Sequence, residues 1–206
     1  MLDKLQIITT SDGSHSLFNT ELNETYHSTH GAVQESLHVF IKNGLEFFEQ
    51  INKSAEIKIL EVGFGTGLNA LLTLQYSLTH LTKILYESLE AFPVDQQTVS
   101  QLNYPTAISF SDAEKYFAQL HQSSWDEPTE ITHSFTLFKR HVKIQDIDLG
   151  LEKFDVIFFD AFAPSKQAEM WEPAILKKIE QSMKPNGVFV TYCAKGQLKR
   201  DLKSLG

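Results

Sequence analysis

The middle of the chain alternates short apolar runs with longer amphipathic segments. Runs rich in Ile, Leu, Val and Phe are typical of parallel strands covered on both faces, and three of them occur, at 57–62, 83–90 and 154–160. Apolar residues at helical spacing predict helices over 68–78, 94–102, 111–122, 172–183 and 196–204. This alternation predicts βαβ units, and therefore an α/β fold with helices on both faces of a mainly parallel sheet.

The two ends of the chain add less regular elements. Residues 1–30 are rich in small polar residues and are predicted to be loop-like, with a hairpin at Asp12-Gly13. Helical spacing then predicts one amphipathic helix that contains Val33, Leu37, Phe40 and Ile41. Two further strands are predicted at 134–144, as a strand or hairpin, and at 188–193, after the turn 185–187. We therefore divide the chain into an N-terminal appendage and helix, 1–50, and a larger domain, 51–206.

Length and composition limit the class of protein. A chain of 206 residues with 42% hydrophobic residues is long enough for one decorated domain. The single cysteine, Cys193, excludes an internal disulfide, lies in an apolar run and fits a reducing cytoplasm. The chain starts without a secretory pattern, and its apolar runs are far shorter than the roughly 20 residues of a membrane span. Because His27 and His30 lack a compact third ligand, no metal site is predicted.

Charge is distributed unevenly. The formal net charge is -8, and only Arg140 and Arg200 are arginines, which argues against a strong general affinity for nucleic acid. Residues 166–206 nevertheless carry eight basic and four acidic side chains. Two interpretations remain open: these lysines solvate exposed helix faces, or they face an anionic partner.

A glycine-rich segment follows the first predicted strand of the larger domain. Gly63, Gly65 and Gly67 have the spacing G-x-G-x-G, and Glu61 precedes them inside the strand. Glycines allow the backbone to turn sharply and approach a ligand, while a helix start offers free N–H donors. A nicotinamide site has the spacing G-x-G-x-x-G, and Glu61 would repel its pyrophosphate. The segment therefore favours the cationic S-adenosylmethionine as cofactor, with a purely structural turn as the alternative.

Three acidic residues follow other predicted strands of the sheet. Glu90 ends the second strand, where open α/β sheets present a carboxylate to a ribose diol; the alternative is a solvated strand end. Asp146 is placed at the end of the third strand, where it can accept a hydrogen bond from an adenine amine, although Asp148 or a simple turn role competes. Asp160 ends the fourth strand beside the reactive end of the cofactor, unless it caps the next helix.

The segment after Asp160 carries candidate substrate contacts. Phe162 can stack on a base, and Pro164 stiffens the loop. Lys166 and Trp171 lie just beyond. This combination predicts a substrate site next to the acid.

Taken together, these segments resemble a known family. The chain is similar to class I methyltransferases related to the methyltransferase half of the bifunctional bacterial enzyme that modifies the tRNA wobble uridine. The resemblance covers most of the chain, and Asp-x-Phe-Ala-Pro followed by Met-Trp is its most specific part. It is carried by Tyr26-His-Ser, Gly31-Ala-Val-Gln-Glu-Ser, His38-Val-Phe, Gly63-Phe-Gly-Thr-Gly-Leu-Asn69, Glu90-Ala-Phe-Pro93 and Phe159–Trp171.

The resemblance implies a reaction and a set of site residues. The reaction is methyl transfer from S-adenosylmethionine to the exocyclic amine of 5-aminomethyl-2-thiouridine in tRNA. It implies a Rossmann-like sheet, a substrate-facing Asp160, and substrate contacts at Phe162, Pro164, Lys166 and Trp171. Cofactor contacts are expected at Glu61, Gly63, Phe64, Gly65, Thr66, Gly67, Asn69, Glu90 and Asp146.

Two departures from the family pattern accompany the resemblance. No flavin oxidase half is expected in this chain, and the last antiparallel strands of the fold are expected to be missing, so that the domain 51–206 is truncated. Two other functions stay open. One is methyl transfer to a small-molecule amine, favoured by the negative net charge, and the other is a non-catalytic relic that retains only the cofactor site.

Overall fold

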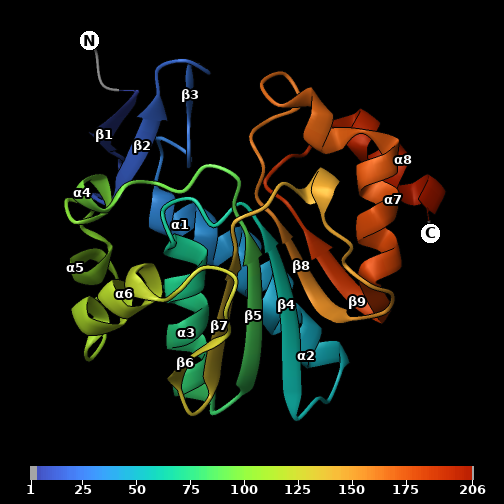
Figure 1. The fold of residues 1–206 in the computed structure, drawn as a ribbon, viewed down its shortest axis with the longest axis horizontal. Helices are drawn as coiled ribbons and strands as arrows, with labels where there is room; N and C mark the ends of the chain where they lie inside the picture. Colours follow the sequence, from blue (N-terminus) through green and yellow to red (C-terminus); the bar gives the residue numbers. More distant parts are fainter. Residues whose placement is uncertain (1–3, 206) are drawn as a thin grey trace.

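Two β-sheets of different size organise the chain in the computed structural model, which describes residues 4–205 (Figure 1). The smaller sheet is antiparallel and consists of β1 (Leu5–Thr9), β2 (His15–Asn19) and β3 (Glu24–Thr25). The predicted hairpin at Asp12-Gly13 is confirmed, since these residues join β1 to β2. Elsewhere between residues 4 and 30 the loop-like prediction is wrong for the three strands, which pair with one another and bury Leu17 fully; residues 1–3 lie outside the described residues.

The larger sheet has six strands in the order β6-β7-β5-β4-β8-β9. All neighbouring strands are parallel except β6, which forms an antiparallel hairpin with β7. The strands are β4 (Glu56–Val62), β5 (Lys83–Leu89), β6 (Thr129–Thr132), β7 (Phe135–Arg140), β8 (Phe154–Phe159) and β9 (Met183–Val190). The chain therefore starts at the centre with β4 and adds strands first on one side and later on the other, which is the doubly wound topology of a Rossmann-like fold.

Alternation along the central strands divides the core between the two faces of the sheet. Ile57 and Ile59 of β4 pack in one apolar cluster, whereas Leu60 and Val62 pack in another. The first cluster includes residues of α3 (Leu68–His80) and α6 (Ala113–Gln122), and the second includes residues of α7 (Pro173–Ser182) and α8 (Gly196–Leu205). The predicted α/β fold with helices on both faces is confirmed.

A continuous helical segment connects the two sheets. It runs through α1 (Ala32–Ser36), the π-helical η1 (Leu37–Glu46) and α2 (Phe47–Ile51). The predicted helix is confirmed, but Leu37 is 41% exposed and lies outside the buried stripe. The wider π turns displace the buried positions from ordinary helical spacing, and a Cβ at Gly44 would lie 3.0 Å from Phe158 and Val190. Close packing on the sheet thus fixes this part of the helix.

Several element boundaries differ from those expected. The segment 94–102 contains only α4 (Gln96–Val99), and α5 (Tyr104–Ile108) was not predicted. Strand β9 includes the predicted turn 185–187 as a register irregularity against β8, with Asn186 at φ +63°. Cys193 lies beyond β9 and is half-buried, so its placement within an apolar strand is corrected. Within the described residues β9 is an edge strand of the sheet, and the expected absence of further strands stays a prediction.

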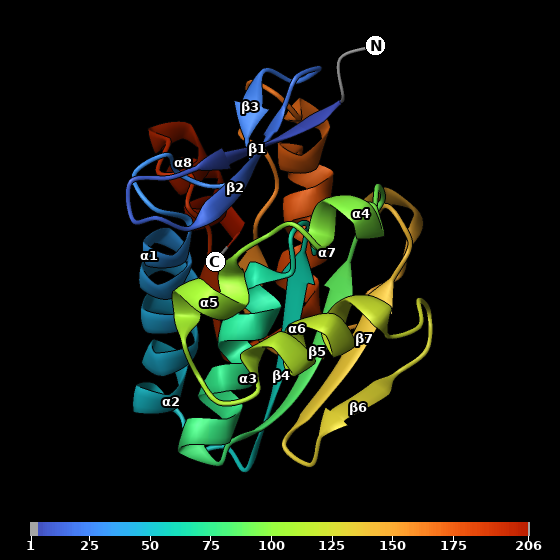
Figure 2. The same ribbon diagram turned by 90° about the vertical axis from the view of Figure 1, so that its left-hand side faces the viewer.

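The small sheet lies over the end of the large sheet at which β4, β5 and β8 finish (Figures 1 and 2). Residues of β1 and the start of α3 line the same cavity, which places the N-terminal segment at the functional end of the molecule. No helix among residues 4–205 is both long and apolar enough to cross a membrane.

Candidate active site

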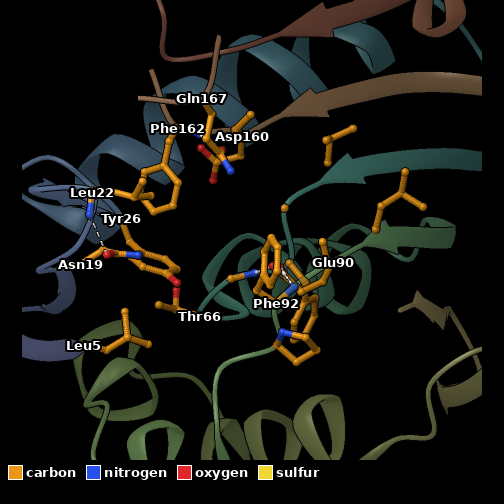
Figure 3. A pocket seen from close by; sticks show the side chains of 18 of the residues that line it. Leu5, Asn19, Leu22, Tyr26, Thr66, Glu90, Phe92, Asp160, Phe162 and Gln167 are labelled. Carbon is orange, nitrogen blue, oxygen red and sulfur yellow. Dashed lines mark hydrogen bonds between the residues drawn. The ribbon is translucent and has the colours of Figure 1, made fainter. Parts of the chain in front are cut away.

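A cavity of about 1570 Å³ lies between the two sheets (Figure 3). Its walls come from β1 and the segment 19–27, from the loops after β4, β5 and β7, and from the loop after β8. The carboxyl ends of strands on both sides of β4 meet here, which is where open α/β sheets bind ligands.

The glycine loop forms the floor of this cavity. Gly63 has φ +97°, and a Cβ there would lie 2.9 Å from the carbonyl oxygen of Asp160. Gly65 has φ +50° and faces the ring of Tyr26. Both positions require glycine, because the backbone is left-handed and passes close to other segments. Phe64, Thr66 and Asn69 also line the cavity, whereas Gly67 does not and instead begins α3.

Glu90 connects the glycine loop to the end of β5. Its Oε2 accepts a hydrogen bond from the Gly65 amide (2.9 Å), and its Oε1 accepts one from the Phe92 amide (2.8 Å). Each carboxylate oxygen has a second acceptor position. The half-buried carboxylate is therefore fixed by backbone donors and still able to accept hydrogen bonds from a diol in the cavity.

Asp146 lines the cavity but does not end a strand. Strand β7 finishes at Arg140, and Asp146 belongs to the 3-10 turn η2 (Ile144–Asp146). The expected position at the strand end is therefore corrected. Ile144 and Ile147 continue the apolar sequence pattern of the strand, but they are core residues of a turn and do not belong to the sheet. The carboxylate nevertheless lies on the same cavity as Glu90.

Glu61 does not line the cavity. Its side chain is fully buried in β4, where Ser88 Oγ donates a hydrogen bond to Oε2 (2.6 Å). Burial raises the pKa of Glu61 to about 8, and the charge of Asp160 adds to this rise against the hydrogen bond from Ser88. At neutral pH the neutral form predominates, so the electrostatic argument that Glu61 selects a cationic cofactor loses its basis.

Asp160 is positioned at the opposite end of the cavity. Asn69 Nδ2 donates a hydrogen bond to Asp160 Oδ2 (2.9 Å), so the start of α3 orients the acid. Burial raises the pKa of Asp160 to about 7; the Asn69 hydrogen bond opposes this shift and the charge of Glu35 adds to it. A carboxyl group that ionises near neutral pH is suited to accept a proton.

The loop after Asp160 is held by its own side chains. The Phe162 amide donates to Gln167 Oε1 (3.2 Å), and Trp171 Nε1 donates to the Phe162 carbonyl (2.8 Å). Phe162 therefore lines the cavity from a fixed backbone. Trp171 is buried against Phe159 and supports the loop from outside the cavity, and Pro164 does not line the cavity either, so the expected substrate contacts of both residues are corrected.

Contacts with the N-terminal segment complete the part of the cavity around Asp160. Lys166 Nζ donates hydrogen bonds to the carbonyls of Leu22 (2.9 Å) and Asn23 (3.0 Å). The ring of Tyr26 meets that of Phe162 edge to face, with centroids 5.0 Å apart (Figure 3). Tyr26 was not predicted as a site residue. The only available signal was its place in a motif of the resemblance, because its contacts are far away in sequence.

Comparison with known proteins agrees with this geometry. A family model described as S-adenosyl-L-methionine-dependent methyltransferase matches residues 103–206, about half of the chain. The chain belongs to this family. Its cofactor is therefore S-adenosylmethionine, as the glycine loop predicted.

Two relatives of this methyltransferase carry the same name. A protein of Idiomarina loihiensis is 29% identical over 91% of this chain and 33% of its own length, and one of Burkholderia thailandensis is 28% identical over 89% and 29%. Both are named tRNA 5-methylaminomethyl-2-thiouridine biosynthesis bifunctional protein MnmC. The chain thus spans about a third of the length of these relatives.

A solved structure supports the fold of this methyltransferase. The crystal structure of MnmC2 from Aquifex aeolicus superposes with a TM-score of 0.78 at 24% identity, covering 98% of this chain and 64% of that one. The expected Rossmann-like methyltransferase sheet is confirmed.

The chemistry of the cavity fits the cofactor. S-Adenosylmethionine presents a sulfonium, an ammonium, two ribose hydroxyls and an adenine amine, which are cationic or donors, besides one anionic carboxylate. The cavity provides the carboxylates of Glu90, Asp146 and Asp160. These groups are acceptors, so the residues present match the donors of the cofactor.

Proposed function

We propose that this methyltransferase transfers a methyl group to the aminomethyl nitrogen of 5-aminomethyl-2-thiouridine at the wobble position of tRNA. The relatives named MnmC support this substrate, since their printed name refers to 5-methylaminomethyl-2-thiouridine in tRNA. The observation that carries the proposal is Asp160, which lines the cavity with a raised pKa on the side of β4 opposite to Glu90.

The division of roles follows from the two ends of the cavity. Glu90 and Asp146 are proposed to hold the ribose and adenine, and the backbone of the glycine loop packs against the rest of the cofactor. Phe162, edge-on to Tyr26, is proposed to contact the pyrimidine ring of the substrate. S-Adenosylmethionine supplies an electrophilic methyl group when bound.

Deprotonation of the substrate amine is the chemical problem that this chain must solve. An alkylamine resembling that of lysine is mostly protonated at neutral pH and has no free electron pair for attack. Asp160 is proposed to attract the ammonium, hold it in line with the methyl group and accept its proton. The nitrogen then forms the new N–C bond, the S–C bond breaks, and the bonding pair stays on sulfur.

The decisive experiment is transfer of a labelled methyl group to tRNA from cells that lack this modification, followed by nucleoside analysis. We expect label in 5-methylaminomethyl-2-thiouridine. Fully modified tRNA serves as the control and should accept no label. Absence of transfer by protein that binds S-adenosylmethionine contradicts the proposal and favours a non-catalytic relic.

One observation favours a second candidate, methyl transfer to a small cationic amine. Carboxylates outnumber lysines on the cavity wall, which suits an amine better than a polyanion. The acidic residues are Glu21, Glu90, Asp95, Asp146, Asp160 and Glu169, and the lysines are Lys4, Lys143 and Lys166. Equal transfer to the free nucleoside and to tRNA would favour this candidate.

A further inference from the structure

Three backbone carbonyls of the Asp146 segment converge on one lysine. Lys178, on α7, donates hydrogen bonds from Nζ to the carbonyl oxygens of Ile144 (2.7 Å), Gln145 (3.0 Å) and Ile147 (3.0 Å). An ammonium has three donors, and all three are used here. The lysine therefore encloses the turn on the side that faces the core.

The same turn is anchored by apolar contacts. Ile144 and Ile147 are buried in the cluster that includes Ile175 and Ile179 of α7. Between them Asp146 is exposed and lines the cavity. The arrangement fixes the backbone of the turn from inside and leaves the carboxylate free on the outside.

We propose that Lys178 is a positioning residue, which holds Asp146 where its carboxylate accepts a hydrogen bond from the adenine amine of the cofactor. This rests on the proposed role of Asp146. The turn lies outside the sheet, so no strand ladder holds its carbonyls in place, and an ammonium supplies charge-assisted hydrogen bonds in their stead. The Lys178 ammonium thus fixes the backbone of the turn, as backbone hydrogen bonds with the end of β7 fix the backbone of Glu90.

The neighbouring lysine provides a matched control. Lys177 is exposed on the same helix and pairs with Glu180 (2.7 Å). Both lysines belong to the basic end of the sequence, for which a solvated face or an anionic partner was considered. The two lysines differ in the structure: Lys177 is exposed to solvent, whereas Lys178 binds the backbone of the Asp146 segment.

The test measures which part of the ligand each residue supports. Calorimetry gives the affinity of the protein for S-adenosyl-L-homocysteine and for its analogue with unsubstituted purine in place of adenine, which lacks the amine. Wild type should prefer the adenine compound, and Lys178→Met should reduce that preference about tenfold, the scale of one lost hydrogen bond to a charged group. Lys177→Met should keep the preference unchanged.

Asp146→Ala distinguishes the two proposals. If Lys178 acts through Asp146, both single variants lose the preference and the double variant loses no more than Asp146→Ala alone. Full preference in Asp146→Ala overturns the role of Asp146, whereas loss there with full preference in Lys178→Met overturns the role of Lys178. Should Lys178→Met unfold, Lys178→Arg restores donors to the carbonyls and must then retain part of the preference.

Discussion

The two ends of the cavity use the same functional group in different surroundings. At the cofactor end, Glu90 accepts hydrogen bonds from two backbone amides and lies half-buried at the tip of a strand. At the reactive end, the carboxylate of Asp160 accepts one hydrogen bond within residues 4–205, from Asn69, and burial raises its pKa to about 7. Holding a ribose diol requires an acceptor that is fixed in place, whereas moving a proton requires a group that ionises near the working pH. Burial and the number of donors decide between these roles.

The largest effect on this contrast is expected for Asp160→Asn. The amide keeps the size of the side chain but cannot accept a proton, so we expect methyl transfer to fall about 100-fold or more with little change in cofactor affinity. In the wild type, transfer should rise with pH through about 7, because Asp160 becomes charged there. The variant should lack the levelling-off above about pH 7, and its low rate should keep rising with pH as the substrate amine loses its proton in solution. Near-normal turnover of the variant would make Asp160 a structural residue.

The corresponding change at the cofactor end is Glu90→Ala. Removal of a charged acceptor is expected to weaken S-adenosylmethionine binding by about 1–3 kcal/mol. Part of this loss comes from the glycine loop, because the Gly65 amide loses its acceptor. Calorimetry checks the affinity, and Glu90→Gln, which keeps one carbonyl oxygen, should lose less. Unchanged affinity in both variants would exclude Glu90 from the cofactor site.

A third prediction separates burial from catalysis at Glu61. Burial raises the pKa of this acid from 4.5 to about 8, so the folded state keeps a proton that the unfolded state releases. The resulting stability is fully present below about pH 4.5 and is lost as the pH rises through about 8. Glu61→Gln stays neutral, so its stability relative to wild type should increase by about 3–4 kcal/mol between pH 5 and pH 8.

Urea unfolding at the two pH values measures this effect. Asp160→Asn is the control, because Asp160 also titrates in this range and contributes its own share. The same pH dependence in Glu61→Gln and wild type would show that Glu61 is charged in the folded protein.

The smallest expected effect concerns lysines near the C-terminal end. Lys199 is exposed on α8, whereas the ammonium of Lys166 is bound to the carbonyls of Leu22 and Asn23. If the basic end binds tRNA phosphates, Lys199→Met should reduce the slope of log affinity against log salt by about one, and Lys166→Met should leave it unchanged. Filter binding over a salt series measures both. A reduced slope for Lys166→Met alone would place the phosphate contact at the cavity mouth.

The arrangement of the glycine loop and Glu90 at the cofactor end could be predicted from local sequence. The strand β4, the glycine loop and α3 are consecutive, and Glu90 follows the next strand, so apolar spacing and glycine positions predicted their arrangement. Asp146 was assigned to the correct cavity from the wrong element, because buried Ile144 and Ile147 extend the apolar pattern past the end of β7.

Sequence was less informative where a side chain contacts backbone far along the chain. Lys166 donates to carbonyls 143 and 144 residues away, and Lys178 to carbonyls 31 to 34 residues away. Every residue has a carbonyl, so no sequence pattern marks such a partner. The same holds for Tyr26, whose ring contacts depend on the packing of the small sheet over the large one.

The Lys166 contact also determines when the reactive end of the protein can form. Ribosomal synthesis produces the β2–β3 turn early, but the lysine that holds it is more than 140 residues later. Closing so long a loop is slow, because its entropy cost precedes any contact that repays it. The glycine loop and Glu90 are 25 residues apart and can meet much earlier. During folding, therefore, we expect the contact between the glycine loop and Glu90 to form before the contacts of Lys166.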